Sequence, residues 1–170
     1  MTKKEASNKQ ENLIAKSLEW QVTSGSGARA FYPGDVSSDS WLGECKTHLS
    51  VTPVLFYWSV WHKIVDESAS QFKRPVLFVD NGTQSLDMTW CMTNTILDYE
   101  GDVYTIPDKC LRVRSIQIDS TLDSHFVYQH PDKEIYFIPF NIFKEMIAGY
   151  PFKWQVSKYL LINRGSCISL

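Results

Sequence analysis

The chain has 170 residues, 44% of them hydrophobic, which is the length and composition of one soluble globular domain. Its formal net charge of −2 at pH 7 argues against a strongly basic protein that coats nucleic acid. No apolar run is long enough to cross a bilayer, and the N-terminus lacks the apolar stretch of a signal peptide, so we expect a cytoplasmic protein without a membrane partner.

Predicted helices and strands alternate in the first half of the chain. Residues 1–7 are polar and expected to fray, and apolar spacing predicts an amphipathic helix over Asn8–Trp20. The elements expected next are a short strand at 20–24, a flexible turn at Ser24–Gly27, a hairpin turn at Ser37–Ser40 that contains Asp39, an apolar segment at Val54–Trp58, a helix at Ser59–Phe72 ended by Pro75, and a buried strand at Val76–Val79 closed by the turn Asp80–Gly82.

The second half is expected to be rich in β-strands. The predicted elements are strands at Met88–Met92, Asp102–Ile106, Leu111–Ile118, His125–Gln129 and Glu134–Ile138, followed by a helix at Asn141–Ala148. Arg112 and Arg114 alternate on one of these strands, where they form either a ridge that follows phosphates or, as we favour, a solvated edge. The tail at Tyr150–Tyr159 interleaves aromatic residues with lysines, which suits base stacking on unpaired nucleic acid or, the reading we favour, a core edge with solvated ammonium groups.

The four cysteines are expected to be reduced. Cys45, Cys91, Cys110 and Cys167 are widely spaced and form no C-x-x-C pair. This pattern favours free thiols over a disulfide framework or a zinc site.

Two carboxylates and an ammonium group are expected to meet near residues 34–46. Asp35 follows Gly34 in a turn, and Glu44 and Lys46 follow about nine residues later. On a strand, the period of two directs Glu44 and Lys46 to one face and Cys45 to the other, toward the core. Carboxylate oxygens suit Mg²⁺, and a lysine beside them can orient water or balance phosphate charge, so the pattern indicates metal-dependent attack on a phosphodiester.

At these residues the chain resembles the PD-(D/E)XK nuclease superfamily, and most closely its small Holliday junction resolvase-like members from archaea and phages. The matching segments are Ser24-Gly25-Ser26-Gly27-Ala28-Arg29, Pro33-Gly34-Asp35-Val36 and Trp41-Leu42-Gly43-Glu44-Cys45-Lys46. The resemblance covers roughly residues 8 to 80. It implies an α/β fold with a restriction-endonuclease-like core, a central mixed sheet flanked by helices, over residues 1–82, and a β-rich extension over 83–170 that completes or elaborates the same domain.

The resemblance also implies the roles of individual residues. Asp35, Glu44 and the carbonyl of Cys45 are expected to bind Mg²⁺ or Mn²⁺, with Glu11 on the first helix as the third carboxylate and Glu19 as its alternative. Lys46 is expected to orient the attacking water or to stabilise the charge that grows on the phosphorane. For binding phosphate, the expected residues are Ser24, Ser26 and Arg29.

The implied partners are DNA, branched or at a junction, and a second copy of the chain in a homodimer with two sites for paired nicks. In a phage-encoded protein the compartment is the host cytoplasm. Trp58 and Trp61 are offered as a dimer surface, with Trp61 as core the favoured reading, and His62 and Lys63 are expected on a solvated helix face rather than at the site. The alternatives are a nuclease with another target, such as restriction, DNA-end processing or RNA cleavage, and a non-catalytic interaction protein that keeps the fold.

Overall fold

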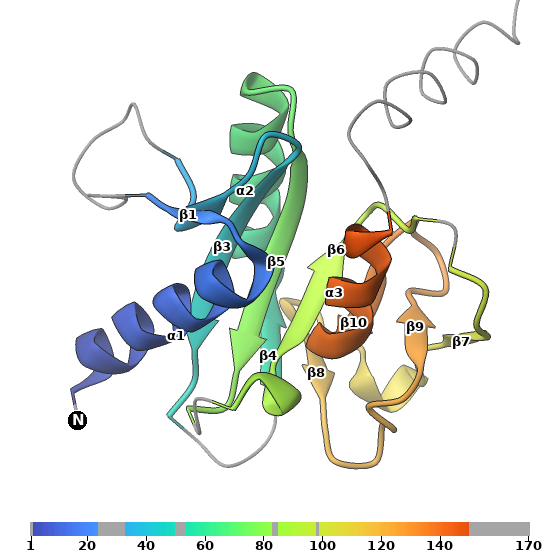
Figure 1. Ribbon diagram of the computed structural model, residues 1–170. Helices are drawn as coiled ribbons and strands as arrows, with labels where there is room; N and C mark the ends of the chain where they lie inside the picture. Colours follow the sequence, from blue (N-terminus) through green and yellow to red (C-terminus); the bar gives the residue numbers. More distant parts are fainter. Residues whose placement is uncertain (1, 24–32, 50–53, 83–84, 98, 150–170) are drawn as a thin grey trace, which may run out of the picture.

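The computed structural model describes residues 2–23, 33–49, 54–82, 85–97 and 99–149. Over these residues the chain is a mixed α and β structure with an eight-stranded mixed sheet, a two-stranded sheet and three α-helices (Figure 1). The general α/β class expected from the sequence is therefore confirmed. No helix among the described residues combines the length and apolar character needed to span a membrane.

The first half has a long helix before its strands and a second one between them, whereas short strands dominate the second half. The first half contains α1 (Lys3–Leu18), β1 (Gln21–Val22), β2 (Val36–Ser37), β3 (Trp41–Thr47), β4 (Val54–Tyr57), α2 (Trp58–Ser70) and β5 (Arg74–Asp80). The second half contains the 3₁₀ turn η1 (Leu86–Met88), β6 (Trp90–Thr93), β7 (Val103–Thr105), η2 (Asp108–Cys110), β8 (Ser115–Ile118), β9 (Val127–Gln129), β10 (Tyr136–Pro139) and α3 (Phe140–Ala148).

Both halves of the chain contribute to the large sheet, whose order is β1-β2-β3-β5-β6-β10-β9-β7. The strands β1, β2 and β3 are antiparallel, whereas β3 and β5 are parallel and pair over their full length from Trp41–Arg74 to Thr47–Asp80. Parallel neighbours need a crossover, and α2 lies within the one that joins β3 to β5. The strands β4 and β8 pair with each other in a separate small sheet.

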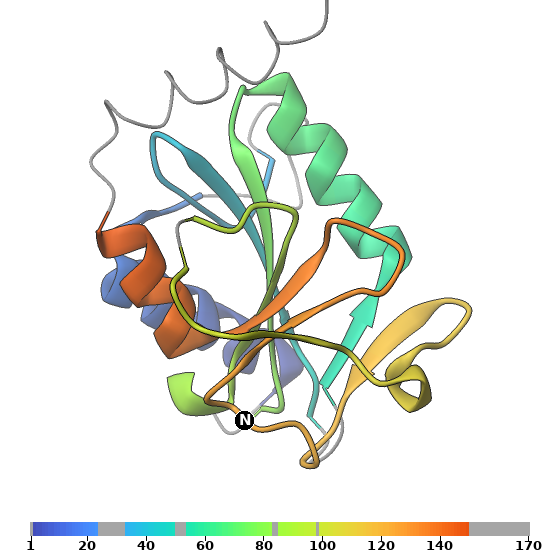
Figure 2. The ribbon, with the colours of Figure 1, turned by 90° about the vertical axis from the view of Figure 1, so that its right-hand side faces the viewer.

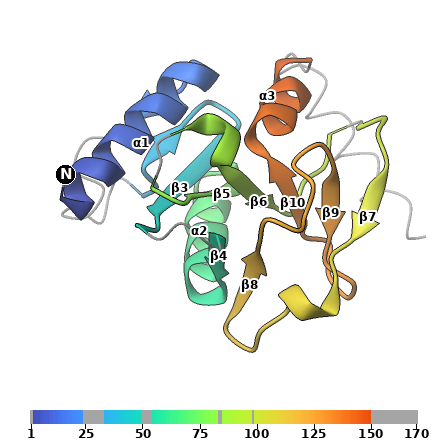
Figure 3. The ribbon, with the colours of Figure 1, turned by 90° about the horizontal axis from the view of Figure 1, so that it is seen from below.

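Helices cover both faces of the large sheet. Figure 3 shows α1 and α3 on one face and α2 with β4 and β8 on the other. The side chains of β5 alternate accordingly: Phe78 packs in the cluster that contains Phe143 of α3, whereas Leu77 packs with Ile64 of α2. This burial on both faces explains the continuously apolar sequence of β5.

The first helix begins earlier than the sequence predicts. Thr2 and Glu5 form a capping box, in which the Thr2 hydroxyl accepts from the Glu5 N–H and the Glu5 carboxylate accepts from the Thr2 N–H. The prediction that residues 1–7 fray is therefore wrong for residues 3–7. These residues are polar, but the capping box stabilises the helix there because its hydrogen bonds satisfy backbone N–H groups at the start of α1.

Two other expectations need correction. Helix α2 ends at Ser70, before Pro75, and Pro75 lies inside β5 opposite Leu42. Arg112 and Arg114 lie in the turn before β8 rather than on one strand face, because β8 begins only at Ser115. The remaining strands of the second half are present but shorter than predicted, and the tail at 150–170 lies outside the described residues.

Candidate functional site

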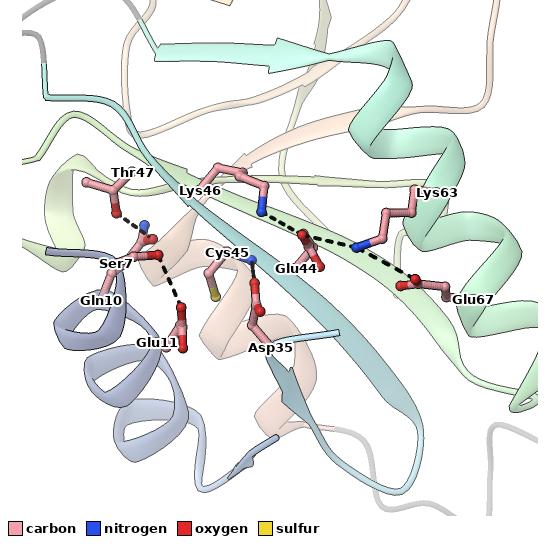
Figure 4. A network of polar contacts seen from close by, with 10 residues as sticks. All are labelled: Ser7, Gln10, Glu11, Asp35, Glu44, Cys45, Lys46, Thr47, Lys63 and Glu67. Atoms are coloured by element: carbon pink, nitrogen blue, oxygen red, sulfur yellow. Dashed lines mark hydrogen bonds and ion pairs between the residues drawn. The ribbon is translucent and has the colours of Figure 1, made fainter. Parts of the chain in front are cut away.

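The carboxylate of Asp35 accepts a backbone hydrogen bond from β3 at a point where β2 no longer pairs with it. Strand β2 pairs with β3 only through Val36 and Ser37, and the Asp35 N–H still donates to the Gly43 carbonyl at 2.8 Å. One step further along β3, the Cys45 N–H donates to Oδ2 of Asp35, also at 2.8 Å (Figure 4). Because alternate residues of a strand direct both backbone groups to the same edge, the Cys45 carbonyl also lies on this edge.

Two glycines allow this close approach. Gly34 has a φ of +73°, and a Cβ there would lie 2.7 Å from Cδ1 of Leu42. A Cβ on Gly43 would lie 2.7 Å from Cε2 of Phe78 and 2.8 Å from Cγ2 of Val36. Gly34 thus sets the turn that delivers Asp35, and Gly43 lets β2 and β3 pack over the core ring.

Glu44 and Lys46 lie on the face of the sheet that α2 covers, as the period of two predicts. The Lys46 ammonium is 2.6 Å from Oε1 of Glu44, and the Lys63 ammonium, from α2, is 3.6 Å from the same oxygen (Figure 4). The Glu44 side chain is 7% exposed, compared with 43% for Lys46 and 55% for Lys63. A buried carboxylate is therefore held between two partly exposed cations.

Burial and the carboxylate have opposite effects on Lys46. Burial alone lowers the pKa of the ammonium, but the hydrogen bond and charge of Glu44, with the charge of Asp35, outweigh it and raise the pKa above its ordinary value. Lys46 is consequently a cation at neutral pH, suited to balancing negative charge.

Glu11 belongs to the same electrostatic neighbourhood. Burial, followed by the charge of Asp35, raises the pKa of Glu11; Glu44 adds to this, and the Ser7 hydroxyl, which donates to Glu11 at 3.1 Å, and Lys46 oppose it. Glu19, the alternative third carboxylate, instead caps the C-terminal end of α1 in a left-handed conformation. It lines a separate hollow with Asp39 and Lys144, so α1 brings Glu11 rather than Glu19 to Asp35.

The oxygen donors fit a hard divalent cation in kind. Asp35, Glu44 and the Cys45 carbonyl offer oxygen atoms, which Mg²⁺ and Mn²⁺ prefer, and burial followed by the charge of Asp35 raises the pKa of Glu11 beside them. The thiol of Cys45 does not contribute, because it is buried in the core and burial raises its pKa well above the ordinary value. Among the described residues, no three His, Cys, Asp or Glu side chains lie close enough together to hold a metal ion by themselves. Any such ion would therefore rely on the backbone carbonyl, water or a movement of Glu11.

The structure adds residues that the sequence reasoning missed. Lys63 is exposed, as expected of a solvated helix face, and it also pairs with Glu44 and, within its own helix, with Glu67 at 3.6 Å. Gln10 is buried beside Glu11 and accepts a 2.9 Å hydrogen bond from the Thr47 hydroxyl, which joins α1 to the end of β3. The Lys63–Glu67 pair follows from its i,i+4 spacing, whereas the contacts of Lys63 and Gln10 with β3 join distant segments and leave no signal in helix spacing.

Several predicted residues do not join the group. Trp61 is 4% exposed, which confirms the favoured prediction that it is a core residue rather than part of a dimer surface. His62 stacks on Trp58. Ser24, Ser26 and Arg29 lie outside the described residues.

Cys45, Cys91 and Cys110 are buried free thiols, and Cys167 lies in the part that is not described.

Comparison with known proteins leaves the family of the chain open. No family model matches the chain, no curated protein matches it, and no solved structure matches it. The geometry of the site therefore carries the functional argument.

Proposed function

We propose that the chain is a metal-dependent endonuclease of the PD-(D/E)XK type that hydrolyses DNA phosphodiesters. The observation that carries the proposal is that Asp35, Glu44, Glu11 and Lys46 share one electrostatic neighbourhood around the part of β3 that β2 leaves unpaired. Acidic oxygens beside a cationic ammonium are the groups that phosphodiester hydrolysis needs, and these come from three separate segments of the chain.

Each side chain has a role that follows from its contacts. Asp35 and Glu44, with the Cys45 carbonyl, would hold Mg²⁺ or Mn²⁺, and Glu11 would complete the site. The bound metal would lower the pKa of water and polarise the phosphate. Lys46, cationic and 43% exposed, would orient the attacking water or stabilise the charge that grows on the phosphorane.

The order of the elements supports a restriction-endonuclease-like core. A helix precedes three antiparallel strands, the third strand carries Glu44 and Lys46, and a helix then leads to β5, which is parallel to β3. This is the arrangement that the resemblance implies for residues 1–82. The strands of residues 83–149 then extend the same sheet beyond β5.

The substrate and assembly follow from the resemblance alone. We propose branched or junction DNA as the substrate and a homodimer as the active form, because paired nicks need two sites that address two strands. The runner-up is a nuclease of the same type with another DNA or RNA target. A non-catalytic interaction protein is disfavoured by the complete set of Asp35, Glu44 and Lys46, since a scaffold needs no buried carboxylate held by two lysines.

A cleavage assay with matched variants tests the proposal. The full chain is incubated with a labelled four-way junction, a duplex and a single strand, in Mg²⁺ or in EDTA. Asp35→Asn, which keeps an acceptor for the Cys45 N–H, and Glu44→Gln are each expected to lower the cleavage rate by at least about 100-fold while folding normally. Asp39→Asn, an exposed carboxylate on the β2–β3 turn, should cut like the wild type.

The pattern of cleavage then separates the candidate functions. Paired, metal-dependent nicks at the junction support the resolvase-like activity, whereas cleavage of every DNA supports general processing. Tight binding without cleavage supports the interaction protein. Wild-type rates for Asp35→Asn or Glu44→Gln would show that the site assignment is wrong.

A further inference from the structure

Phe72, the residue after the C-terminal cap of α2, has a left-handed backbone conformation that glycine adopts most readily. Phe72 has a φ of +56°, and its N–H donates to the Ala69 carbonyl at 3.2 Å while the Lys73 N–H donates to the Ser68 carbonyl at 2.9 Å. These two hydrogen bonds form a Schellman motif, whose left-handed residue is most often glycine or asparagine. Figure 2 shows this end of α2 at the top of the molecule, beside the start of β5.

Among the described residues, no packing contact accounts for a phenylalanine at this position. Residue Phe72 is 98% exposed, so its ring packs against no other part of the described chain. A left-handed conformation is unfavourable for a bulky side chain, and an exposed ring adds an aggregation risk. Backbone strain combined with an unused aromatic ring is typical of a contact surface.

This ring lies just before the β3–β5 pair that carries part of the candidate site. Arg74, two residues after Phe72, is opposite Trp41 at the start of the β3–β5 pairing, and Glu44 is three residues further along β3. Because Phe72 precedes Arg74 by two residues on the side away from Glu44, five residues of strand rise separate Phe72 from the level of Glu44, which is up to about 16 Å. Five stacked nucleotides at about 3.4 Å per step cover a similar length.

The surroundings of the ring favour a polyanion over a second copy of the chain. The segment 68–75 contains Lys73 and Arg74 and no carboxylate. The Arg74 N–H donates to the Ser40 carbonyl, which brings the β2–β3 turn alongside, with its serines and the exposed carboxylate of Asp39. A two-fold contact between copies centred on Phe72 would bring Lys73 and Arg74 of each copy together, and like charges oppose that contact.

We propose that Phe72 stacks on a nucleic-acid base exposed at a branch, nick or strand end, up to about five nucleotides from the phosphodiester held at Asp35 and Glu44. Lys73 contacts the adjoining backbone phosphate. The distance to the phosphodiester rests on the proposed function, whereas the stacking itself does not. An aromatic face accepts any base, so the contact adds affinity for exposed bases without sequence preference.

Two substitutions test the stacking without unfolding the chain. Phe72→Gly and Phe72→Asn both suit the left-handed position, so the urea midpoint should stay equal or rise. Affinity for a fluorescein-labelled four-way junction, measured by anisotropy in EDTA so that no cleavage occurs, should fall by about 5- to 150-fold, the range for one lost base–aromatic stack. Val113→Ser, at another apolar residue that is 97% exposed, is the matched control and should bind like the wild type.

The same measurements can overturn the proposal. Unchanged affinity of both Phe72 variants, or no junction binding by the wild type, would show that the ring does not stack on bases. Light scattering in which Phe72→Gly converts a dimer to a monomer would assign the ring to an interface between copies and overturn it as well. A wild type that binds through Phe72 but cuts no DNA would refute hydrolysis and leave the stacking in place.

Discussion

Replacing Gly34 by alanine should destabilise the chain and displace Asp35. A non-glycine residue at the φ of +73° costs about 1–2 kcal/mol. The new Cβ would lie 2.7 and 2.9 Å from two side-chain carbons of Leu42 and 3.1 Å from the Gly43 carbonyl oxygen. Overpacking of that kind costs about 1–3 kcal/mol, and the lower entropy of the unfolded alanine chain offsets about 0.4–1 kcal/mol. We therefore expect Gly34→Ala to lower the free energy of unfolding by about 2–4 kcal/mol.

Urea denaturation followed by circular dichroism measures this change, and a second glycine supplies the control. Gly149, at the end of α3, has a φ of −76°, and a Cβ there would meet no described atom within 4 Å, so Gly149→Ala should change stability by less than about 1 kcal/mol. A Gly34→Ala protein within about 0.5 kcal/mol of the wild type would refute the claim that this turn requires glycine. In folded Gly34→Ala, cleavage should also fall, because the turn sets the carboxylate of Asp35.

Three further predictions follow from the charges and the assembly. Lys46→Ala should slow cleavage by about 100-fold or more at saturating metal, whereas Lys73→Ala should mainly reduce the salt dependence of DNA binding; equal, mild effects would make Lys46 an ordinary surface charge. Burial and Asp35 raise the pKa of Glu11, so the folded state holds that proton more tightly than the unfolded state, and stability falls as pH rises from 4.5 through the raised value. Glu11→Gln should therefore be more stable than the wild type in urea at about pH 7 but not at about pH 4, and no difference at neutral pH would contradict this. Light scattering at micromolar concentration should show a dimer, and a monomer that still cleaves DNA would remove the paired-nick mechanism.

Local sequence signals predicted much of the fold and the centre of the site. The period of two placed Glu44 and Lys46 on one face of a strand and Cys45 in the core, and apolar runs located β5 and both helices of the first half. Those signals work because they depend on neighbours a few residues apart. The same locality explains the error at the start of α1, where the capping box of Thr2 and Glu5 decided the boundary.

Local sequence patterns could not predict contacts between residues that are far apart in the sequence. Lys63 looks like any solvated helix lysine until β3 brings Glu44 within 3.6 Å of it. Gln10 and Thr47 are 37 positions apart, and neither alone indicates a buried hydrogen bond. The choice of Glu11 over Glu19 likewise depends on how α1 lies across the sheet, which the spacing along the helix does not set.

The most direct test of metal-dependent hydrolysis is a single-turnover cleavage measurement on a labelled four-way junction across a titration of Mg²⁺ or Mn²⁺, comparing the wild type with Glu44→Gln. We expect a wild-type rate that rises with metal to saturation and vanishes in EDTA, and a Glu44→Gln rate at least about 100-fold lower at every metal concentration. Cleavage that persists in EDTA, or equal rates for the two proteins, would contradict a metal-dependent site at Glu44.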